Sequence, residues 1–473
     1  MRIARTILSA TIAVSLAACG GSDSSSGSSS GGPISSSGGG GGGGDTCSLA
    51  SRQQFVRDVL DEWYLFPDLL DTSVNPANFS DIQEYIDALV APARAQDKDR
   101  FFTYITSIRE ETELIENGSS AGFGIRLGYD TSANRVFVIE AFENGNAFPV
   151  DIDRGTELLA IDGQAVSSLM SSGGPSAVIQ ALGPSDPGVA RTLRYRTAAG
   201  VERTETITKS EFSLDPISDR YGVRILNDGT EDVGYINLRT FIVQDAGPQL
   251  REAFSQFRSR GIEKIILDLR YNGGGLVSVA ELLGDLMASD QVGNVFSRTV
   301  LRDSKSSENE TDLFSAQPQA IDATKVAVIG RRGTASASEL VTNSFIPYLG
   351  ENLALIGTNT FGKPVGQFAF DRSACDDRFR AVTFKTTNAD GNGEYFSGLA
   401  GVVDRTCAAA DDISRQLGDP NEQSVSVALD FLAGRTCTPI SGGQDRTVQS
   451  ARGQTLLQPR MPTPAQRENP GLF

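Results

Sequence analysis

The sequence predicts an α/β protein of several domains: a small helical N-terminal unit, a β-rich domain and an α/β core with a mixed sheet. Three observations lead to this expectation. At 473 residues the chain is long enough for two or three domains. Its composition, 39% hydrophobic and 21% charged, is ordinary for a soluble globular protein. Finally, the pattern of apolar residues changes twice along the chain, as the following paragraphs describe.

The N-terminal unit is expected at residues 47–117. Between Arg52 and Phe66, apolar residues recur at steps of three and four, which makes one stripe of an amphipathic helix. Pro67 is expected to end this helix. A second helix is predicted from Asp81 to Val90. We interpret the apolar stripe as core packing rather than as a binding face.

The second region, residues 118–214, alternates short apolar strands such as 136–139 with turns of Gly and Asp, which predicts a β-rich domain. Two landmarks stand in it: the loop G-F-G-I at 122–125, and R-G-T-E-L-L-A-I-D-G at 154–163. A glycine-flanked loop turns successive backbone N–H groups toward one point, and an adjacent strand edge can pair with an extended peptide.

These two landmarks, in this order and about thirty residues apart, resemble the carboxylate-binding loop and the strand-turn signature of PDZ domains. The resemblance implies a PDZ-like domain in which Phe123, Gly124 and Ile125 bind a peptide. The alternative is a β-rich domain with two incidental glycine turns.

The third region, residues 215–437, changes to a strand, helix and strand pattern. A strand is expected at 233–238, a helix at 248–258 and a largely apolar strand of the buried parallel type at 264–269. A further strand at 325–329 leads into a serine-rich segment. Loops at the carboxyl ends of such strands are the usual place for a site. The remaining residues, 438–473, are polar and are expected to form a loose tail.

Residues 1–18 have a basic start followed by an apolar run, too short to span a bilayer, that ends before Cys19; this predicts a signal peptide. The sequence L-A-A-C at 16–19 resembles a bacterial lipobox, which would make Cys19 the lipidated first residue. The alternative is a secretory signal with an incidental cysteine. Residues 19–46, almost pure Gly and Ser, are expected to form a flexible tether.

The resemblance to lipoproteins also implies a location. Residue 20 is Gly rather than the Asp that commonly signals retention in the inner membrane. We therefore expect an outer-membrane lipoprotein of a bacterium that faces the periplasm or the cell surface, attached to the membrane through its lipid anchor.

Four cysteines follow Cys19, and an even number in an exported chain suggests two disulfides with three possible connectivities. We favour Cys407 with Cys437, which would close a loop around the C-terminal helix, and Cys47 with Cys375 by elimination. Free buried thiols are the alternative.

Charge and the lack of histidine exclude several classes of function. The net charge of −17 becomes −19 when Arg2 and Arg5 leave with the signal segment, and so acidic a chain argues against nucleic acid as a partner. Without histidine there is no Ser-His-Asp triad and no histidine zinc motif. We expect no metal and no cofactor, and any hydrolytic chemistry needs another base.

The segment S-A-S-E at 336–339 has two compatible interpretations. As a capping box, Ser336 would bond the amide of Glu339 while the Glu339 side chain reaches back. A serine at a helix N-terminus also sits where backbone amides and the positive end of the helix dipole can stabilise an oxyanion. A nucleophile here needs only a base beside it.

The stretch from Gly357 to Lys363 nearly spells a phosphate-binding loop, but Pro364 stands where that motif needs Ser or Thr, and a strand rather than a helix follows. We therefore interpret Lys363 as a general base. Nearby apolar residues could desolvate its ammonium and lower its pKa. Gln367, four residues on, could hold the amine in place. The alternative is a solvated surface lysine.

The third segment, D-L-R-Y-N-G-G-G-L at 268–276, overlaps the end of the buried strand. Three glycines allow a tight turn with exposed N–H groups, which an oxyanion hole requires. A plain turn is the alternative.

Together these segments resemble the carboxyl-terminal processing proteases, also called tail-specific proteases, which are Ser-Lys peptidases. The family's order of PDZ domain, D-L-R-x-N-x-G-G turn, S-A-S-E and T-F-G-K is present over roughly residues 52–435. The resemblance implies that the third region is a protease core. It implies that Ser336 is the nucleophile, Lys363 the general base and Gln367 the residue that orients Lys363. It further implies an oxyanion hole formed by Ala337 and a turn glycine, for which we choose Gly274.

Two departures from the family pattern matter. Ser338 precedes Lys363 by 25 residues, the spacing of the family, whereas Ser336 precedes it by 27. Spacing alone would therefore select Ser338; we follow the motif, because residues 345–352 could hold a two-residue insertion. In addition, Pro364 replaces the common Gly.

The function implied is that of a serine endopeptidase that cleaves unfolded or C-terminally tagged exported proteins, with the PDZ-like domain recognising the substrate tail. The alternative is a catalytically inactive, membrane-tethered lipoprotein that only binds peptides. Peptides, unfolded proteins and C-terminal tails are the expected partners. The sequence leaves open whether a regulatory adaptor also binds.

Overall fold

The computed structural model describes residues 47–441 and 454–473. The predicted signal peptide (1–18), the tether (19–46) and Cys19 lie outside the described residues. Within the described ranges, none of the helices combines the length and the apolar character needed to cross a membrane.

The core is a six-stranded sheet in which all neighbours run parallel except the antiparallel pair β10 and β11. In spatial order its strands are β10 (Val223–Asn227), β11 (Asp232–Asn237), β12 (Lys264–Asp268), β15 (Lys325–Gly330), β16 (Leu353–Gly357) and β19 (Arg405–Ala408). The predicted mixed sheet is therefore present, and the three strands predicted for it, β11, β12 and β15, lie within a residue of the expected positions.

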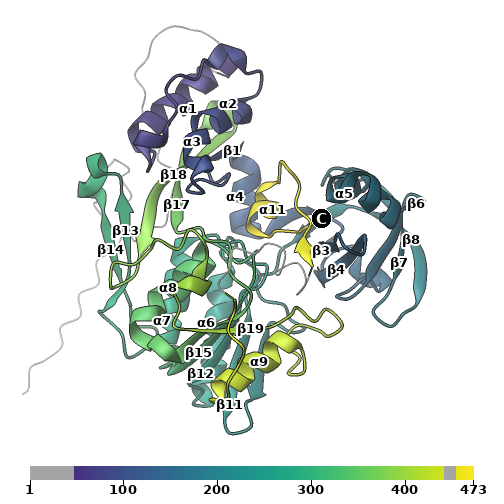
Figure 1. The fold of residues 1–473 in the computed structure, drawn as a ribbon, viewed down its shortest axis with the longest axis vertical. Helices are drawn as coiled ribbons and strands as arrows, with labels where there is room; N and C mark the ends of the chain where they lie inside the picture. The colour runs from purple at the N-terminus through teal and green to yellow at the C-terminus, as the bar shows by residue number, and fades with distance from the viewer. Residues whose placement is uncertain (1–46, 442–453) are drawn as a thin grey trace, which may run out of the picture.

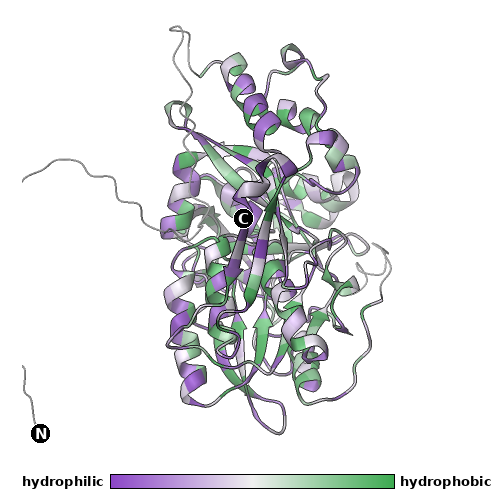
Figure 2. Ribbon diagram, turned by 90° about the vertical axis from the view of Figure 1, so that its left-hand side faces the viewer, coloured by the Kyte–Doolittle hydropathy of each residue, from purple (hydrophilic) through white to green (hydrophobic). Residues whose placement is uncertain are grey.

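Helices cover both faces of this sheet (Figure 1). One face packs against α6 (Ala246–Ser259), α7 (Val277–Met287) and α8 (Ala337–Leu349), and the other against α9 (Gln423–Leu432). Successive strand residues point to opposite faces, so Ile265 and Leu267 join the first cluster and Ile266 joins the second. The strands accordingly consist largely of hydrophobic residues, many of them coloured green in Figure 2.

The β-rich domain is a seven-stranded antiparallel sheet with a helical segment, α5 (Val166–Leu182), that is kinked at Gly174. Its strands are β3 (Ile125–Asp130), β4 (Arg135–Ala141), β5 (Glu157–Ile161), β6 (Gln164–Ala165), β7 (Ala190–Arg196), β8 (Glu202–Thr208) and β20 (Thr455–Leu456). A two-stranded ribbon of β2 (Ser119–Gly122) and β9 (Ser210–Ser213) lies at its entry and exit. One strand of the large sheet thus comes from the C-terminal segment.

The N-terminal unit contains α1 (Leu49–Trp63), α2 (Ile82–Leu89), α3 (Ala91–Ala95) and α4 (Ile108–Asn117). It is helical, as expected, but it is joined to the core by a second sheet that the sequence did not reveal. This sheet consists of β1 (Tyr104–Ser107), β13 (Val295–Leu301), β14 (Glu310–Leu313), β17 (Val365–Arg372) and β18 (Asp377–Thr387). Because β1 pairs with β18, the N-terminal unit and the core share one apolar cluster.

Both favoured disulfides are confirmed. Cys47 is bonded to Cys375, which ties the start of the N-terminal unit to the loop between β17 and β18. Cys407 is bonded to Cys437 and closes a loop around α9.

The C-terminal segment differs from the expected loose tail over residues 454–473. It contains β20 and a short helix, α11 (Pro464–Glu468), and its Leu457, Leu472 and Phe473 side chains are buried. The prediction from polar composition was wrong for two reasons. The few apolar side chains of the segment are the ones that pack against the rest of the protein, and backbone pairing with β3 satisfies amides of the segment. Figure 1 shows α11 between the N-terminal unit and the β-rich domain.

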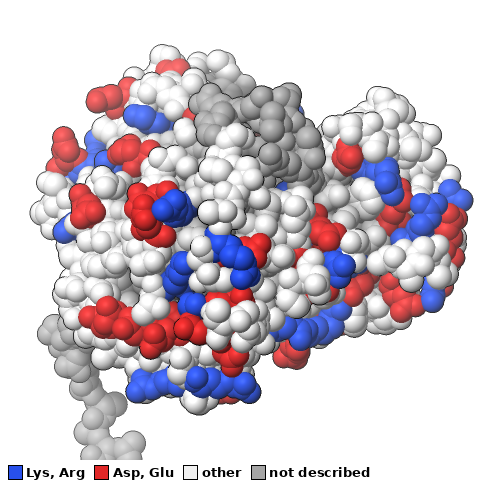
Figure 3. Space-filling view, turned by 60° about the horizontal axis from the view of Figure 1, so that its bottom comes forward, with Lys and Arg blue, Asp and Glu red and all other residues white. Residues whose placement is uncertain are grey.

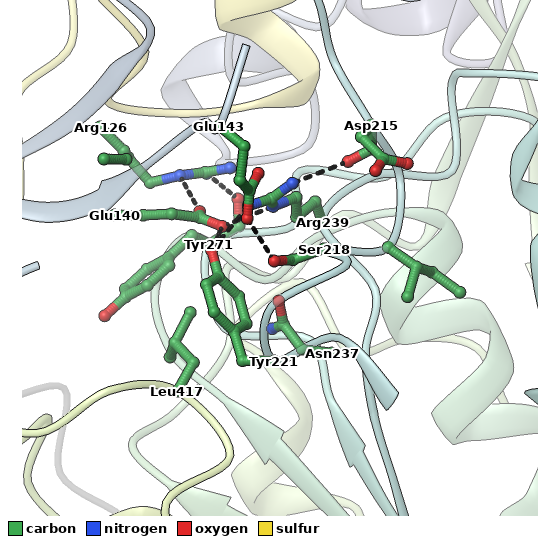
Figure 4. Close-up of polar contacts among 12 residues, drawn as sticks. Arg126, Glu140, Glu143, Asp215, Ser218, Tyr221, Asn237, Arg239, Tyr271 and Leu417 are labelled. Atoms are coloured by element: carbon green, nitrogen blue, oxygen red, sulfur yellow. Dashed lines mark hydrogen bonds and ion pairs between the residues drawn. The ribbon is translucent and has the colours of Figure 1, made fainter. Parts of the chain in front are cut away.

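A buried cluster of charges joins the β-rich domain to the core (Figure 4). Glu140 on β4 accepts hydrogen bonds from Arg126 at 3.0 Å and from Arg239 and Tyr221 at 2.7 Å. Burial alone would raise the pKa of Glu140, but the two guanidinium groups lower it to about 2. Removal of one partner would leave a buried charge without its counter-charge, so this cluster fixes how the two domains meet.

The outer surface carries both signs of charge. On the face drawn in Figure 3, acidic and basic side chains lie side by side. Exposed ion pairs of the protein include Arg405 with Glu351 and Arg435 with Asp430.

Candidate active site

Ser336 lies after β15, at the N-cap of α8, and is half-buried. Its backbone has φ +55° and ψ −117°. A positive φ is unfavourable for a residue with a Cβ, and such strained positions cluster at functional sites. The sharp bend places the Ser336 side chain at the point where the strand ends and the helix begins, the arrangement typical of an exposed nucleophile.

The buried carboxylate of Glu339 holds this bend. Its Oε2 accepts the Ser336 N–H at 3.1 Å and the Lys363 N–H at 2.7 Å, and its Oε1 accepts the Gly362 N–H and the Thr360 hydroxyl, each at 2.6 Å. Burial raises the pKa of Glu339, while these four hydrogen bonds act in the opposite direction. Glu339 therefore joins the serine segment to the lysine loop, a role beyond the helix cap that the sequence predicts.

Ser338, the serine that spacing alone would select, has a different environment. Its side chain is fully buried, and its hydroxyl donates to the Asn272 carbonyl at 3.1 Å. The same carbonyl accepts the Ala335 N–H. Ser338 thus fastens the glycine turn to the start of α8.

Lys363 lies in the loop before β17 and is partly buried. Its ammonium donates to Gln367 Oε1 at 2.9 Å, and Gln367 in turn donates to the Phe102 carbonyl. The predicted contact between Lys363 and Gln367 is therefore present. Burial lowers the pKa of Lys363, and the nearby carboxylates of Glu468 and Asp99 partly offset this effect.

The apolar wall beside Lys363 comes from the N-terminal unit. The Phe102 ring centre lies 5.0 Å from the ammonium nitrogen, and this ring packs against Phe361. Arg100 donates to the carbonyls of Phe361 and Gly362, so the N-terminal unit also holds the backbone of the lysine loop. The sequence places the desolvating residues near Lys363 in the chain; it gave no sign of Phe102.

Ser336 and Lys363 are linked through Glu339, which accepts both backbone N–H groups. Among the described residues, no hydrogen bond joins the Ser336 hydroxyl to the Lys363 ammonium, which bonds Gln367 instead. The two predicted partners thus lie in one place, with the lysine ammonium bonded to Gln367, the residue predicted to orient it.

The glycine turn at 273–275 packs directly on the serine. A Cβ placed on Gly274 would lie 2.7 Å from the Ser336 Cβ and 3.2 Å from the Ala337 nitrogen, so only glycine fits there. The Gly274 N–H, predicted as an oxyanion donor, bonds the Asn272 side chain at 2.9 Å. The Gly273 N–H bonds the Glu468 carbonyl at 2.9 Å.

Arg126 on β3 connects the β-rich domain to this turn. Its Nη1 donates to the Tyr271 carbonyl at 2.6 Å and to the Pro470 carbonyl at 3.1 Å. Tyr271, two residues before Gly273, has a φ of +69°. Sequence reasoning missed Arg126, because nothing in the chain relates residue 126 to a turn about 145 residues later.

The backbone N–H groups of Phe123, Gly124 and Ile125 converge, as predicted, on one point. All three donate to the carbonyl oxygen of Phe473, each at 3.1 Å. A Cβ on Gly122 would lie 2.5 Å from the Phe473 carbonyl carbon, which shows how closely that residue approaches. Three converging amides make an arrangement suited to a carboxylate.

Across 47–441 and 454–473, no group of three or more cysteine or carboxylate side chains is arranged to hold a metal ion.

Comparison with known families agrees with this geometry. Residues 232–399 match the family described as peptidase family S41, and residues 51–104 match the peptidase S41 N-terminal domain. Over these residues the chain is similar to the S41 peptidases. The first segment contains the serine, the lysine and the glycine turn, and the second contains Phe102.

The curated relatives are named as C-terminal processing enzymes. The chain is 29% identical over 271 residues to the chloroplastic C-terminal processing peptidase of Tetradesmus obliquus, with 54% of each chain covered. It is 26% identical over 265 residues to the carboxyl-terminal-processing protease of Synechocystis, with 55% of this chain and 57% of that protein covered. The match thus spans about half the length of these relatives.

A solved structure shares the fold more widely. A protein from Bacteroides fragilis described as an S41 protease superposes with a TM-score of 0.61, covering 80% of this chain and 97% of its own. The sequence identity is 22%, so the likeness concerns the fold.

Proposed function

We propose that the protein is a serine endopeptidase of the S41 type that uses Ser336 and Lys363 as a catalytic dyad. The observation that carries the proposal is the strained Ser336 at the N-terminus of α8, joined through buried Glu339 to a lysine whose pKa burial lowers. A neutral lysine amine can accept a serine proton, which supplies the base that a chain without histidine lacks.

The reaction would be acyl transfer. Ser336 Oγ attacks the peptide carbonyl while Lys363 takes the hydroxyl proton and returns it to the leaving amine; water then hydrolyses the ester. For this step the Lys363 amine must turn from Gln367 toward Ser336. The Ala337 N–H, in the first turn of α8, has no carbonyl one turn earlier in the helix and is therefore suited to the oxyanion. Gly274 stays the predicted second donor. Its N–H would have to be shared between the oxyanion and the Asn272 side chain, to which it donates.

The environment of the two serines supports Ser336 over Ser338. The Ser338 hydroxyl is buried and committed to Asn272, whereas Ser336 is partly exposed and packs beside the glycine turn. A nucleophile must meet its substrate, which a fully buried hydroxyl cannot do.

The β-rich domain is proposed to act as a PDZ-like module that binds the C-terminal tail of an unfolded or tagged protein. Its support is the convergence of the Phe123, Gly124 and Ile125 amides on one point at the start of β3. The names of two relatives, a C-terminal processing peptidase and a carboxyl-terminal-processing protease, are in keeping with such a substrate.

A second candidate is a catalytically inactive protein that only binds peptides. The one observation in its favour is that Lys363 bonds Gln367 rather than Ser336. In either case we propose attachment to the outer membrane through Cys19, with the chain facing the periplasm or the cell surface and a regulatory adaptor as a possible additional partner.

One experiment separates these proposals. The purified full-length protein is incubated with an unfolded protein beside the Ser336→Ala, Ser338→Ala and Lys363→Ala variants. We expect cleavage by the parent, its loss in Ser336→Ala and Lys363→Ala, and measurable activity in Ser338→Ala. No cleavage by the parent would favour the binding protein, and loss only in Ser338→Ala would overturn the assignment of the nucleophile.

A separate experiment tests the anchor. Cys19→Ala is expected to release the protein from the membrane fraction of bacterial cells. Unchanged membrane attachment would contradict the lipidation proposal.

A further inference from the structure

The peptide-binding edge of the β-rich domain is already occupied by the chain's own residues 471–473. The Phe473 carbonyl takes the three amides of the loop at 123–125, the Phe473 N–H donates to the Ile125 carbonyl at 2.8 Å, and the Leu127 N–H donates to the Gly471 carbonyl at 2.7 Å. Residues 471–473 therefore lie on β3 as an added antiparallel strand, which is how a peptide binds by strand addition.

The side chain of Phe473 anchors this strand. It is 1% exposed and belongs to the same buried cluster as Phe123 and Ile125 and as Val178 and Leu182 of α5. The end of the segment thus lies where a PDZ-like domain would place the last residue of a ligand, with a large apolar side chain inside.

The same segment also reaches the candidate catalytic turn. The Glu468 carbonyl, at the end of α11, accepts the Gly273 N–H at 2.9 Å, and a Cβ on Gly273 would lie only 2.8 Å from that oxygen. The Glu468 carboxylate lies near enough to Lys363 to raise the pKa of that lysine. Figure 1 shows α11 between the N-terminal unit and the β-rich domain, next to the end of the chain.

We propose that residues 454–473 are an intramolecular competitor of the substrate. They fill the peptide groove with Phe473 and cover the glycine turn with Glu468 until a peptide that ends in a large apolar residue displaces them. The effect on cleavage rests on the proposed peptidase function; the effect on peptide binding does not.

Tethering makes such a competitor effective. A segment joined to its own site acts at an effective concentration that reaches the millimolar range for short flexible linkers. An external peptide can bind only those molecules whose groove is free. Its apparent affinity is therefore the intrinsic affinity multiplied by the fraction of molecules with a free groove. Weakening the docked segment should therefore raise both peptide affinity and cleavage rate.

Gly471→Val is the variant that weakens docking without altering the groove. Gly471 has φ +88°, and a Cβ there would lie 2.9 Å from the Leu127 carbonyl oxygen. The matched control is Met461→Ser in the same segment, because Met461 is 82% exposed. The groove residues are unchanged in both variants.

The first measurement is binding of a labelled peptide, R-E-N-P-G-L-F, which copies residues 467–473. It is made by fluorescence anisotropy on the full chain carrying Ser336→Ala, so that no cleavage intervenes. We expect the Gly471→Val variant to bind at least about tenfold more tightly than the parent or the Met461→Ser control. The same peptide ending in Asp should bind weakly to all three.

The second measurement is cleavage of an unfolded protein with Ser336 intact. Gly471→Val should cleave faster than the parent, and added peptide should slow it again. Unfolding of the whole variant would lower peptide binding and cleavage rate, so it cannot explain a gain in either. A thermal melt followed by circular dichroism checks that the variant is folded. Equal peptide affinity in parent and Gly471→Val would overturn the proposal, as would a lowered melting temperature without any gain in affinity.

The two proposals fail in distinguishable ways. If Gly471→Val binds the peptide more tightly but no variant cleaves protein, the segment is a competitor in a binding protein and the peptidase proposal fails. If the parent cleaves but peptide affinity is unchanged by Gly471→Val, the peptidase proposal stands and the competitor is overturned.

Discussion

The two sides of the candidate site are built in different ways. The serine side combines the residues after β15 with the glycine turn after β12, and these are neighbouring strands of one sheet. The base side places Lys363 against Phe102 from the N-terminal unit and Glu468 from the C-terminal segment. The serine side is thus complete once the core folds, whereas the environment that sets the pKa of Lys363 needs segments from both ends of the chain.

Glu339 is the residue that joins the two sides, so its substitution should have the largest effect. Glu339→Gln replaces one acceptor oxygen of a carboxylate that takes four hydrogen bonds with an NH₂ group that cannot accept. We expect kcat/KM to fall about 100-fold, or about 2.7 kcal/mol, which is typical for the loss of hydrogen bonds to a charged group. Initial rates of protein cleavage measure this.

The matched control for that variant is Glu351→Gln, which alters an exposed carboxylate paired with Arg405. It should leave kcat/KM unchanged, because exposed ion pairs contribute little. Activity of Glu339→Gln within about twofold of the parent would mean that the two sides hold their positions without this carboxylate.

Phe102→Ala tests the base side alone. Burial lowers the pKa of Lys363, so the neutral amine increases as pH rises through a midpoint below 10.5. Removing the ring admits water to the ammonium, which raises that pKa and moves the rise in kcat/KM to higher pH. At neutral pH we expect about a tenfold loss that recovers as the pH is raised.

The neighbouring Phe101→Ala is its control, since Phe101 is 60% exposed and lies against Arg94. A loss of activity in Phe102→Ala that does not recover at high pH would show that the ring positions Lys363 rather than desolvating it.

The difference between the serine side and the base side also explains which site residues the sequence could predict. Ser336, Ala337 and the glycine turn stand in short motifs at strand ends, and the structure brings these motifs together. The contact from Lys363 to Gln367 is also local, four residues apart. Phe102, Arg126 and Glu468 carry no such signal, because their contacts join segments more than 100 residues apart.

The fold shows the same limit. Strands β11, β12 and β15 and helix α6 follow from apolar periodicity, and all lie close to their predicted positions. The sheet of β1, β13, β14, β17 and β18 was not predicted, because its pairing joins residues such as Tyr104 and Arg380 across most of the chain. The docked C-terminal segment was missed because composition averages out the few apolar residues that matter.

Glu468→Gln should shift the pH profile in the direction opposite to Phe102→Ala. The Glu468 carboxylate raises the pKa of Lys363, so its neutralisation lowers that pKa and moves the rise in kcat/KM to lower pH. The pH dependence of kcat/KM reports the pKa values of the free enzyme, in which the C-terminal segment is docked. A shift of a few tenths of a pH unit is expected, and Glu308→Gln on an exposed turn should give none. A shift to higher pH would contradict the assigned sign.

The two disulfides give the smallest expected effect on catalysis and separate stability from activity. Cys407→Ala with Cys437→Ala opens a loop whose ends are 30 residues apart, which should lower the free energy of unfolding by about 3 to 4 kcal/mol. That loop encloses α9, on the face of the sheet opposite α8, so kcat/KM at 25 °C should change less than about twofold.

Opening Cys47–Cys375 instead loosens the N-terminal unit that carries Phe102, and it should shift the pH midpoint toward 10.5. Thermal melts and pH–rate profiles of both pairs measure this; an unshifted profile for the second pair would show that the shared apolar cluster of β18 and α1 holds Phe102 in place without the bond.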